Sequence, residues 1–173
     1  RQATKQAAKM AGLTDIDIRV IEEPTAAAIA KNLGGVQGNI IVIDVGAGTT
    51  DVVIGHMEVT EDGLRLITTT RECDDVLGGV DMDNLILDYV MQKDTKPPTL
   101  CEIYTELDTN QRLRLMGKIE EAKISASQCG DGVISTVLAT TPSKRIHVPL
   151  DGAQLANIVA PVINGYTTES FVR

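Results

Sequence analysis

One short segment of the sequence combines the residue types that bind phosphate and a divalent cation. It reads DVGAGTTD and lies between two apolar, β-branched runs. Gly46 and Gly48 permit a tight turn whose backbone amides can approach an anion, and Thr49 adds a hydroxyl donor. Asp44 and Asp51 flank this turn, and Mg²⁺ prefers carboxylates while it keeps much of its hydration shell. The segment therefore predicts a phosphate-binding hairpin turn with acids that hold hydrated Mg²⁺ or position a water.

Other phosphate-binding motifs do not describe this segment. A P-loop needs GK[ST] before a helix, and a dinucleotide-binding fingerprint needs GxGxxG at the start of a helix. Neither pattern is present in the sequence. The plainer interpretation is a hairpin turn whose acidic strand ends aid solubility. Two further segments favour a binding role: EPTAAA at 23–28 lies upstream, and GGVD at 78–81 lies downstream between a predicted strand and a predicted helix.

The composition limits the classes of function. The 173 residues suit one domain or one lobe of a larger protein, and 43% of them are hydrophobic. The net charge of −8 and the 2% of aromatic residues argue against nucleic-acid binding. No apolar run approaches the roughly 18 to 20 residues that span a bilayer, and the N-terminus lacks the apolar region of a signal peptide. We therefore expect a soluble, cytoplasmic chain that binds neither nucleic acid nor membrane.

The cysteines and histidines offer little for metal or nucleophilic chemistry. Cys73, Cys101 and Cys129 form no CxxC pair, so we expect free, mostly buried thiols in preference to a zinc site or a redox pair. His56 and His147 are the only histidines, which leaves almost nothing for a histidine-based metal cluster or a catalytic triad.

Alternating and periodic apolar residues predict the elements that position the first motif. A helix is expected within residues 1–11, and a strand at 16–20 is expected to run into a helix beginning near EEPTAAA. Three apolar runs joined by tight turns, at 39–45, 51–59 and 64–70, predict an antiparallel meander followed by a loop, RECDDVLGGV.

The second half of the sequence predicts helices around one hairpin. DMDNLILDYVMQK has the spacing of a helix that TKPP ends, and a second long helix is expected from about Thr109 to Gln128. Two apolar runs around TPSK predict a hairpin. Asp151 and Gln154 predict a capping box at the start of a last helix.

Several motifs in the same order resemble those of the DnaK-type (seventy-kilodalton) heat-shock chaperones, a family within the actin-like ATPase superfamily. The matching segments are RQATKQAAKMAGL, VIEEPTAAAIA, IDVGAGTTDVVI, LGGVDMD and EEAKISAS. The resemblance runs from Arg1 to Arg173, but it covers only the second half of such an ATPase domain. It implies an α/β fold: a ribonuclease H-like or actin-like ATPase lobe with a mixed sheet and an inserted, smaller α+β subdomain.

The resemblance also implies a division of the chain. Residues 1–38 would be the end of the first lobe and the crossing helix. Residues 39–80 and about 151–173 would form the core of the second lobe. Residues 81–150 would be the helices and small sheet of the inserted subdomain.

Site residues follow from the resemblance by position. Glu23, Asp44 and Asp51 would be catalytic, and the two aspartates would lie near Mg²⁺, through water. The residues that would contact ATP or ADP are Gly46, Ala47, Gly48 and Thr49 of the phosphate loop, Gly79, and Glu120, Lys123 and Ser127 on one helical face.

Plainer interpretations stand beside these roles. Glu23 can be an acid stabilised at a helix N-terminus, and Glu120 with Lys123 can be a surface pair. Ala47 departs from the family pattern, which has glycine in that position of the loop. Its methyl group either tightens the approach to phosphate or is harmless.

The function implied is that of a lobe of an ATP-dependent chaperone, with ATP or ADP and Mg²⁺ as cofactors. Unfolded peptides, co-chaperones and a nucleotide-exchange factor would be partners through the full-length protein. The fragment alone is not expected to hydrolyse ATP appreciably, because the first phosphate loop and the catalytic lysine of the first lobe are not in it. Two alternatives remain: a lobe of an actin-like filament protein of the MreB or FtsA type, and a docking surface at about 81–160 for an exchange partner.

Overall fold

A computed structural model describes residues 2–13, 18, 20–31, 38–61, 63–74 and 77–168. The chain divides into two compact units. The first consists of Arg1–Asp44 and Thr50–Cys73, and the second of Val45–Thr49 and Asp74–Arg173. Within the described ranges, no helix is both long and apolar enough to cross a membrane.

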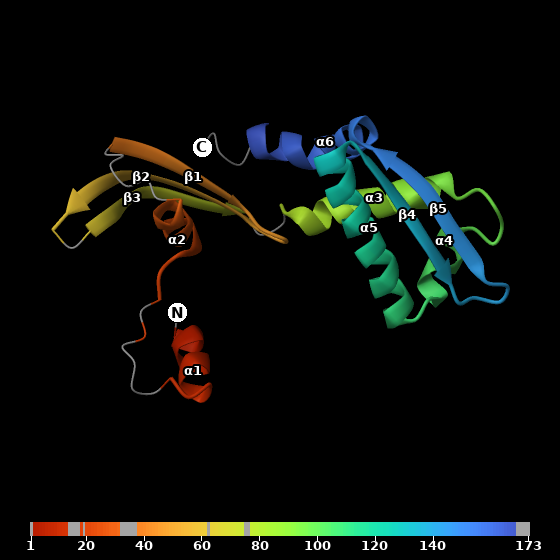
Figure 1. The fold of residues 1–173 in the computed structure, drawn as a ribbon, viewed down its shortest axis with the longest axis horizontal. Helices are drawn as coiled ribbons and strands as arrows, with labels where there is room; N and C mark the ends of the chain where they lie inside the picture. The colour runs from red at the N-terminus through yellow and green to blue at the C-terminus, as the bar shows by residue number, and fades with distance from the viewer. Residues whose placement is uncertain are drawn as a thin grey trace. The chain divides into compact units, whose positions relative to one another are not determined.

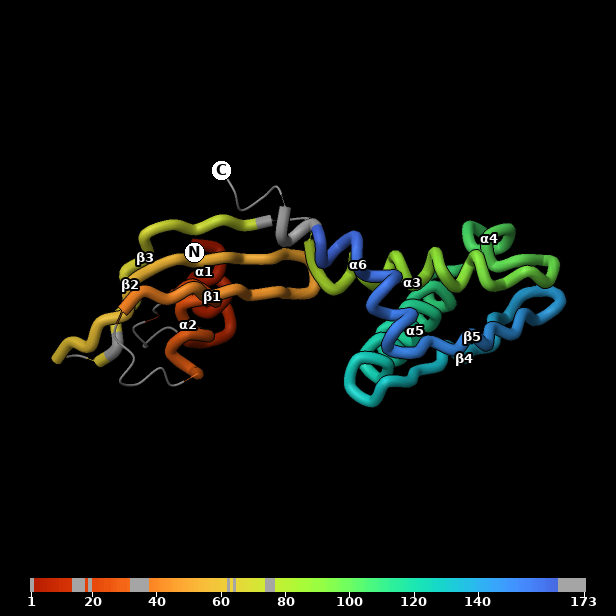
Figure 2. The backbone as a smooth tube through the Cα atoms, turned by 90° about the horizontal axis from the view of Figure 1, so that it is seen from above, coloured from red at the N-terminus to blue at the C-terminus, as the bar shows by residue number. Residues whose placement is uncertain are grey.

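The first unit contains a three-stranded sheet with two helices. The strands are β1 (Gly38–Val45), β2 (Thr50–Thr60) and β3 (Gly63–Asp74), and β2 lies between the other two (Figures 1 and 2). The helices are α1 (Gln2–Met10) and α2 (Glu23–Ala30), of which α2 packs against β2. The three predicted strands and their neighbour order are confirmed.

Two predicted segments of this unit, residues 16–20 and residues 71–74, are not found as expected. The strand expected at 16–20 lies mostly outside the described residues, and Ile18 and Val20 are in neither helix nor strand. The segment RECD, expected in a loop, instead continues β3 to Asp74. Four residues expected in a loop therefore add to the strand beside β2.

The second unit is built from helices around a two-stranded antiparallel hairpin. Helix α5 packs on both strands, α6 packs on β5, and α3 packs against α5 and α6 (Figure 1). The elements are α3 (Gly79–Lys93), α4 (Leu100–Ile103), the 3-10 helix η1 (Tyr104–Glu106), α5 (Thr109–Cys129), β4 (Asp131–Leu138), β5 (Lys144–Asp151) and α6 (Gly152–Thr168).

The hairpin buries one face, as the alternation of its residues requires. Ile134 lies opposite Val148, and Thr136 lies opposite Ile146; all four are buried with the helices. The other face is exposed. The core consists of these residues and the inward faces of the helices, which include Ile86, Val90, Leu100, Leu115, Ile119 and Leu155.

Local signals set the helix ends. The Asp108 carboxylate accepts a hydrogen bond from the Gln111 backbone N–H (2.8 Å), and α5 ends at Gly130, whose φ of 86° favours glycine. The predicted capping box is confirmed. The Gln154 N–H donates to Asp151 Oδ1 (2.7 Å), and the Asp151 N–H donates to Gln154 Oε1 (3.0 Å).

The expected burial of the cysteines is wrong, because Cys73, Cys101 and Cys129 are all exposed. In α4 the inward positions belong to Leu100 and Ile103, so Cys101 and Glu102 between them face outward. Cys129 is the last residue of α5, beyond the buried stripe of that helix.

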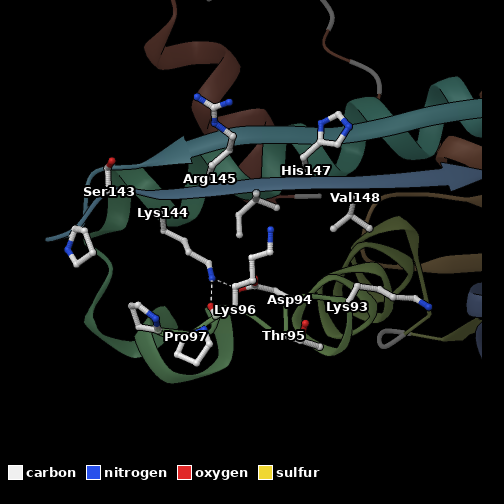
Figure 3. A pocket seen from close by; sticks show the side chains of 13 residues that line it. Lys93, Asp94, Thr95, Lys96, Pro97, Ser143, Lys144, Arg145, His147 and Val148 are labelled. Atoms are coloured by element: carbon white, nitrogen blue, oxygen red, sulfur yellow. Dashed lines mark hydrogen bonds and ion pairs between the residues drawn. The ribbon is translucent and has the colours of Figure 1, made fainter.

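A buried ion pair ties the hairpin to the loop after α3 (Figure 3). Lys144 Nζ lies 2.7 Å from Asp94 Oδ2 and donates to the Lys96 carbonyl oxygen, and the two side chains of the pair are only 8% and 10% exposed. The Leu100 N–H donates to the same carboxylate oxygen (2.6 Å). The pair lies at a hollow of about 420 Å³, and the Arg145 side chain points away from it, on the other side of β5.

We predict that Lys144→Met lowers the free energy of unfolding by about 3–5 kcal/mol, because it leaves the Asp94 carboxylate buried without its cation. The double variant Lys144→Met/Asp94→Asn should recover a large part of the loss. Urea unfolding measures both. Lys118→Met is the matched control, because its pair with Glu121 is exposed and should contribute less than about 1 kcal/mol. Equal losses in the single and double variants would contradict the explanation.

Candidate functional site

The loop between β1 and β2 has the form of an anion cradle. The Gly46 N–H donates to the Thr49 carbonyl oxygen (2.8 Å), which closes the turn. The N–H groups of Ala47, Gly48 and Thr49 have no hydrogen-bond partner among the described residues, and all three residues are exposed. Three adjacent amide donors without partners suit an anion with several acceptor oxygens, such as a phosphate.

The start of α3 fixes the orientation of this loop. The Gly79 N–H donates to the Gly46 carbonyl oxygen (3.1 Å), and the Val80 N–H donates to the Ala47 carbonyl oxygen (2.7 Å). In a trans peptide the C=O and the next N–H point in opposite directions. The two carbonyls therefore point at α3, and the N–H groups of Ala47 and Gly48 point away from it. The first amides of α3 orient the loop and do not serve as anion donors themselves.

This contact requires a glycine at position 78. A Cβ atom there would lie 2.5 Å from the Ala47 carbonyl oxygen and 2.7 Å from Gly48 Cα. Gly78 is buried, and its N–H donates to the Asp81 carboxylate (2.8 Å), which also fixes the start of the helix. Gly79 was the predicted site residue in this segment. The structure adds Gly78: the double glycine in the sequence indicated a special backbone position, but its contact with the loop is visible only in the structure.

Lys123 links α5 to the same end of α3. Its Nζ lies 2.8 Å from Asp83 Oδ1 and 3.3 Å from the Gly79 carbonyl oxygen. The Lys123 and Asp83 side chains are 18% and 12% exposed, so the ion pair is largely shielded from water. The interaction holds α5 beside the residues that contact the loop.

A mainly apolar groove of about 520 Å³ lies between α3, α5 and α6 in the same unit. It brings Lys123 and Ser127 together with Ile124, whereas Glu120 is exposed and lies outside the lining. The lining also includes Met82, Ala126, Gly152, Leu155, Val159 and Ile163. The groove has the mixture of apolar walls and few polar groups that is typical of small-molecule sites.

The three predicted catalytic acids lie in the first unit. Glu23 is the exposed first residue of α2, and Asp44 is half-buried on β1. Asp51, on β2, is paired with Arg71 on β3: the Arg71 Nη2 and Nε lie 2.8 and 3.2 Å from Asp51 Oδ1. The hydrogen bonds that Arg71 donates to Asp51 raise the pKa of the guanidinium, so Arg71 stays charged at all relevant pH values. Arg71 was not among the predicted site residues, because its segment was expected to be a loop.

The donors present fit a hydrated magnesium ion and a phosphate. In the described part of the chain, no cluster of three or more histidine, cysteine or acidic side chains could hold a metal ion. Mg²⁺ does not need such a cluster, since it is usually bound through one or two carboxylates while it keeps several waters. Asp44 and Asp51 would be carboxylates of that kind, and the loop amides would be the phosphate donors.

We predict that Gly78→Ala destabilises the protein by about 1–3 kcal/mol, because the added methyl group would overlap the Ala47 carbonyl oxygen and displace the loop. Urea unfolding measures the change. Gly117→Ala is the control: a Cβ there meets no atom within 4 Å, and alanine favours the helix by roughly 0.5–1 kcal/mol. If both variants were equally stable, the close contact would not exist.

The comparisons with known proteins agree on one family. A family model described as "Hsp70 protein" matches residues 1–170. The mitochondrial iron-sulfur cluster biogenesis chaperone of Saccharomyces cerevisiae is 37% identical over 169 residues, which are 95% of this chain and 24% of that protein. The chaperone protein DnaK of Elusimicrobium minutum is 34% identical over 168 residues, which are 94% of this chain and 26% of that protein.

A third relative supports the same conclusion. The chaperone protein HscA homolog of Herminiimonas arsenicoxydans is 35% identical over 164 residues, which are 94% of this chain and 24% of that protein. The chain spans about a quarter of the length of these relatives. Since the family model matches nearly all of it, the chain belongs to the Hsp70 family.

Proposed function

We propose that this chain is a nucleotide-binding part of an ATP-dependent chaperone and that it binds ATP and ADP with Mg²⁺. The observation that carries the proposal is the loop of residues 46–49, whose unpartnered amides are oriented by α3. Family membership and the chaperone names of the relatives favour this function over the filament-forming alternative.

The loop and the groove of the second unit have separate roles in this proposal. The amides of Ala47, Gly48 and Thr49, with the Thr49 hydroxyl, would bind phosphate oxygens. The groove would accept adenosine, with Ile124 against the base and Lys123 and Ser127 near the polar atoms of the nucleoside. Gly79 would act indirectly, because its N–H group helps to orient the loop through the hydrogen bond to the Gly46 carbonyl oxygen. Glu120 is exposed beside the groove, so its contact with the nucleotide would be at the rim.

The acids of the first unit would serve the metal ion. Asp44 and Asp51 would hold the waters around Mg²⁺, and Glu23 would belong to the same network of carboxylates and water. When bound, Mg²⁺ supplies positive charge that stabilises the phosphates during transfer. The carboxylates would orient the attacking water, and the loop amides would stabilise the charge on the phosphate oxygens.

Several finer assignments remain proposals for the full-length protein. They are the mixed sheet with an inserted subdomain, the division at residues 38, 80 and 150, and the peptide clients, co-chaperones and exchange factor. The cytoplasmic location also stays a prediction, because one relative is named as mitochondrial.

The proposal predicts that the full-length protein binds MgADP and that Ile124→Glu weakens this binding at least about tenfold, or ~1.4 kcal/mol. A carboxylate in the groove would lose hydration and repel the phosphates. Calorimetry with MgADP measures the affinity. Leu113→Glu is the matched control, because Leu113 lies on the same helix, is 64% exposed and does not line the groove. Equal affinities for the two variants would place the nucleotide elsewhere.

A further inference from the structure

Arg71 contacts two carboxylates of the first unit at once. Two of its nitrogens, Nη2 and Nε, donate to Asp51 Oδ1 at 2.8 and 3.2 Å. The third, Nη1, lies 3.4 Å from Glu22 Oε1. One guanidinium therefore faces two negative charges, and all of its nitrogens are directed at them.

The geometry leaves one oxygen of Asp51 available. Both hydrogen bonds from Arg71 go to Oδ1, and Oδ2 has no partner among the described residues. Two donors on one planar group fix the orientation of the Asp51 side chain. A ligand that approaches Oδ2 therefore meets a carboxylate of fixed orientation whose charge is already partly balanced.

The burial distinguishes this pair from an ordinary surface pair. The Arg71 side chain is 41% exposed, but Asp51 is only 15% exposed, so the field at this carboxylate is screened less than in open water. On the same two strands, Arg65 lies 4.0 Å from Glu58, and these side chains are 69% and 38% exposed. A pair of that kind has little effect on its surroundings.

We propose that Arg71 is a positioning residue that acts through Asp51 and lowers the affinity of the site for Mg²⁺. This inference rests on the proposed function, in which Asp51 holds the hydrated ion. Arg71 with Asp51 and Glu22 has a net charge of −1, and the two acids without Arg71 have −2. A dication is attracted less to the first arrangement, and in water-like surroundings the difference corresponds to about a three- to tenfold change in affinity.

The test is calorimetry of ADP binding to the full-length protein, in saturating Mg²⁺ and in EDTA. The ratio of the ADP affinity in Mg²⁺ to the ADP affinity in EDTA reports how strongly Mg²⁺ binding is coupled to ADP binding. It requires no measurement of turnover. We expect Arg71→Gln to raise this ratio about three- to tenfold, because it removes the charge. Arg71→Lys, which keeps the charge, should leave the ratio within about twofold of the wild type. Arg65→Gln is the matched control: it removes the same charge from β3, at the exposed pair with Glu58, and should leave the ratio unchanged.

Each other outcome overturns the inference. An unchanged ratio in Arg71→Gln, with lower thermal stability, would make Arg71 a structural residue only. A lower ratio in both Arg71 variants would mean that Arg71 promotes metal binding by holding Asp51 in place. Failure of the wild type to bind ADP in either condition would instead contradict the proposed function, so the two failures are distinguishable.

Discussion

The contact between the loop of residues 46–49 and the start of α3 is the constraint on which the candidate site depends. Two backbone hydrogen bonds take up the carbonyls of Gly46 and Ala47, and peptide geometry then turns the following N–H groups away from the helix. The contact exists because Gly78 has no side chain where the two backbones meet. A turn with three unpartnered amides is thereby built from backbone atoms, in a chain whose net charge is −8.

The same end of α3 also organises the groove. Lys123 reaches from α5 to Asp83 and to the Gly79 carbonyl, so the helix that carries Ile124 and Ser127 is attached next to the loop contact. The core residues of α3, α5 and α6 supply the apolar packing that keeps these helices together. In the first unit, Arg71 does for Asp51 what Lys123 does for Asp83: it gives a poorly exposed acid a fixed partner.

Features set by local sequence could be predicted, and features set by long-range contacts could not. The capping box of Asp151 and Gln154 and the extent of α5 follow from neighbouring residues, and both are confirmed. Several motifs in the same order identified the family, because each of them is a run of consecutive residues. The role of Gly78 depends on a backbone far away in the sequence, and the pairing of Arg71 depends on β3 continuing into the segment that was expected to be a loop. The helical spacing placed Glu120 on one face with Lys123 and Ser127, but the groove lining on α5 begins at Lys123, about one turn after Glu120.

The central claim is that the backbone amides of the loop bind the phosphates of a nucleotide. It is tested most directly by nuclear magnetic resonance of the full-length protein with labelled alanine and glycine, titrated with MgADP. The amide signals of Ala47 and Gly48 should shift strongly as the site fills, whereas the Gly63 amide, at the start of β3, should not move. Saturation with MgADP that leaves the Ala47 and Gly48 amides unchanged would contradict the claim.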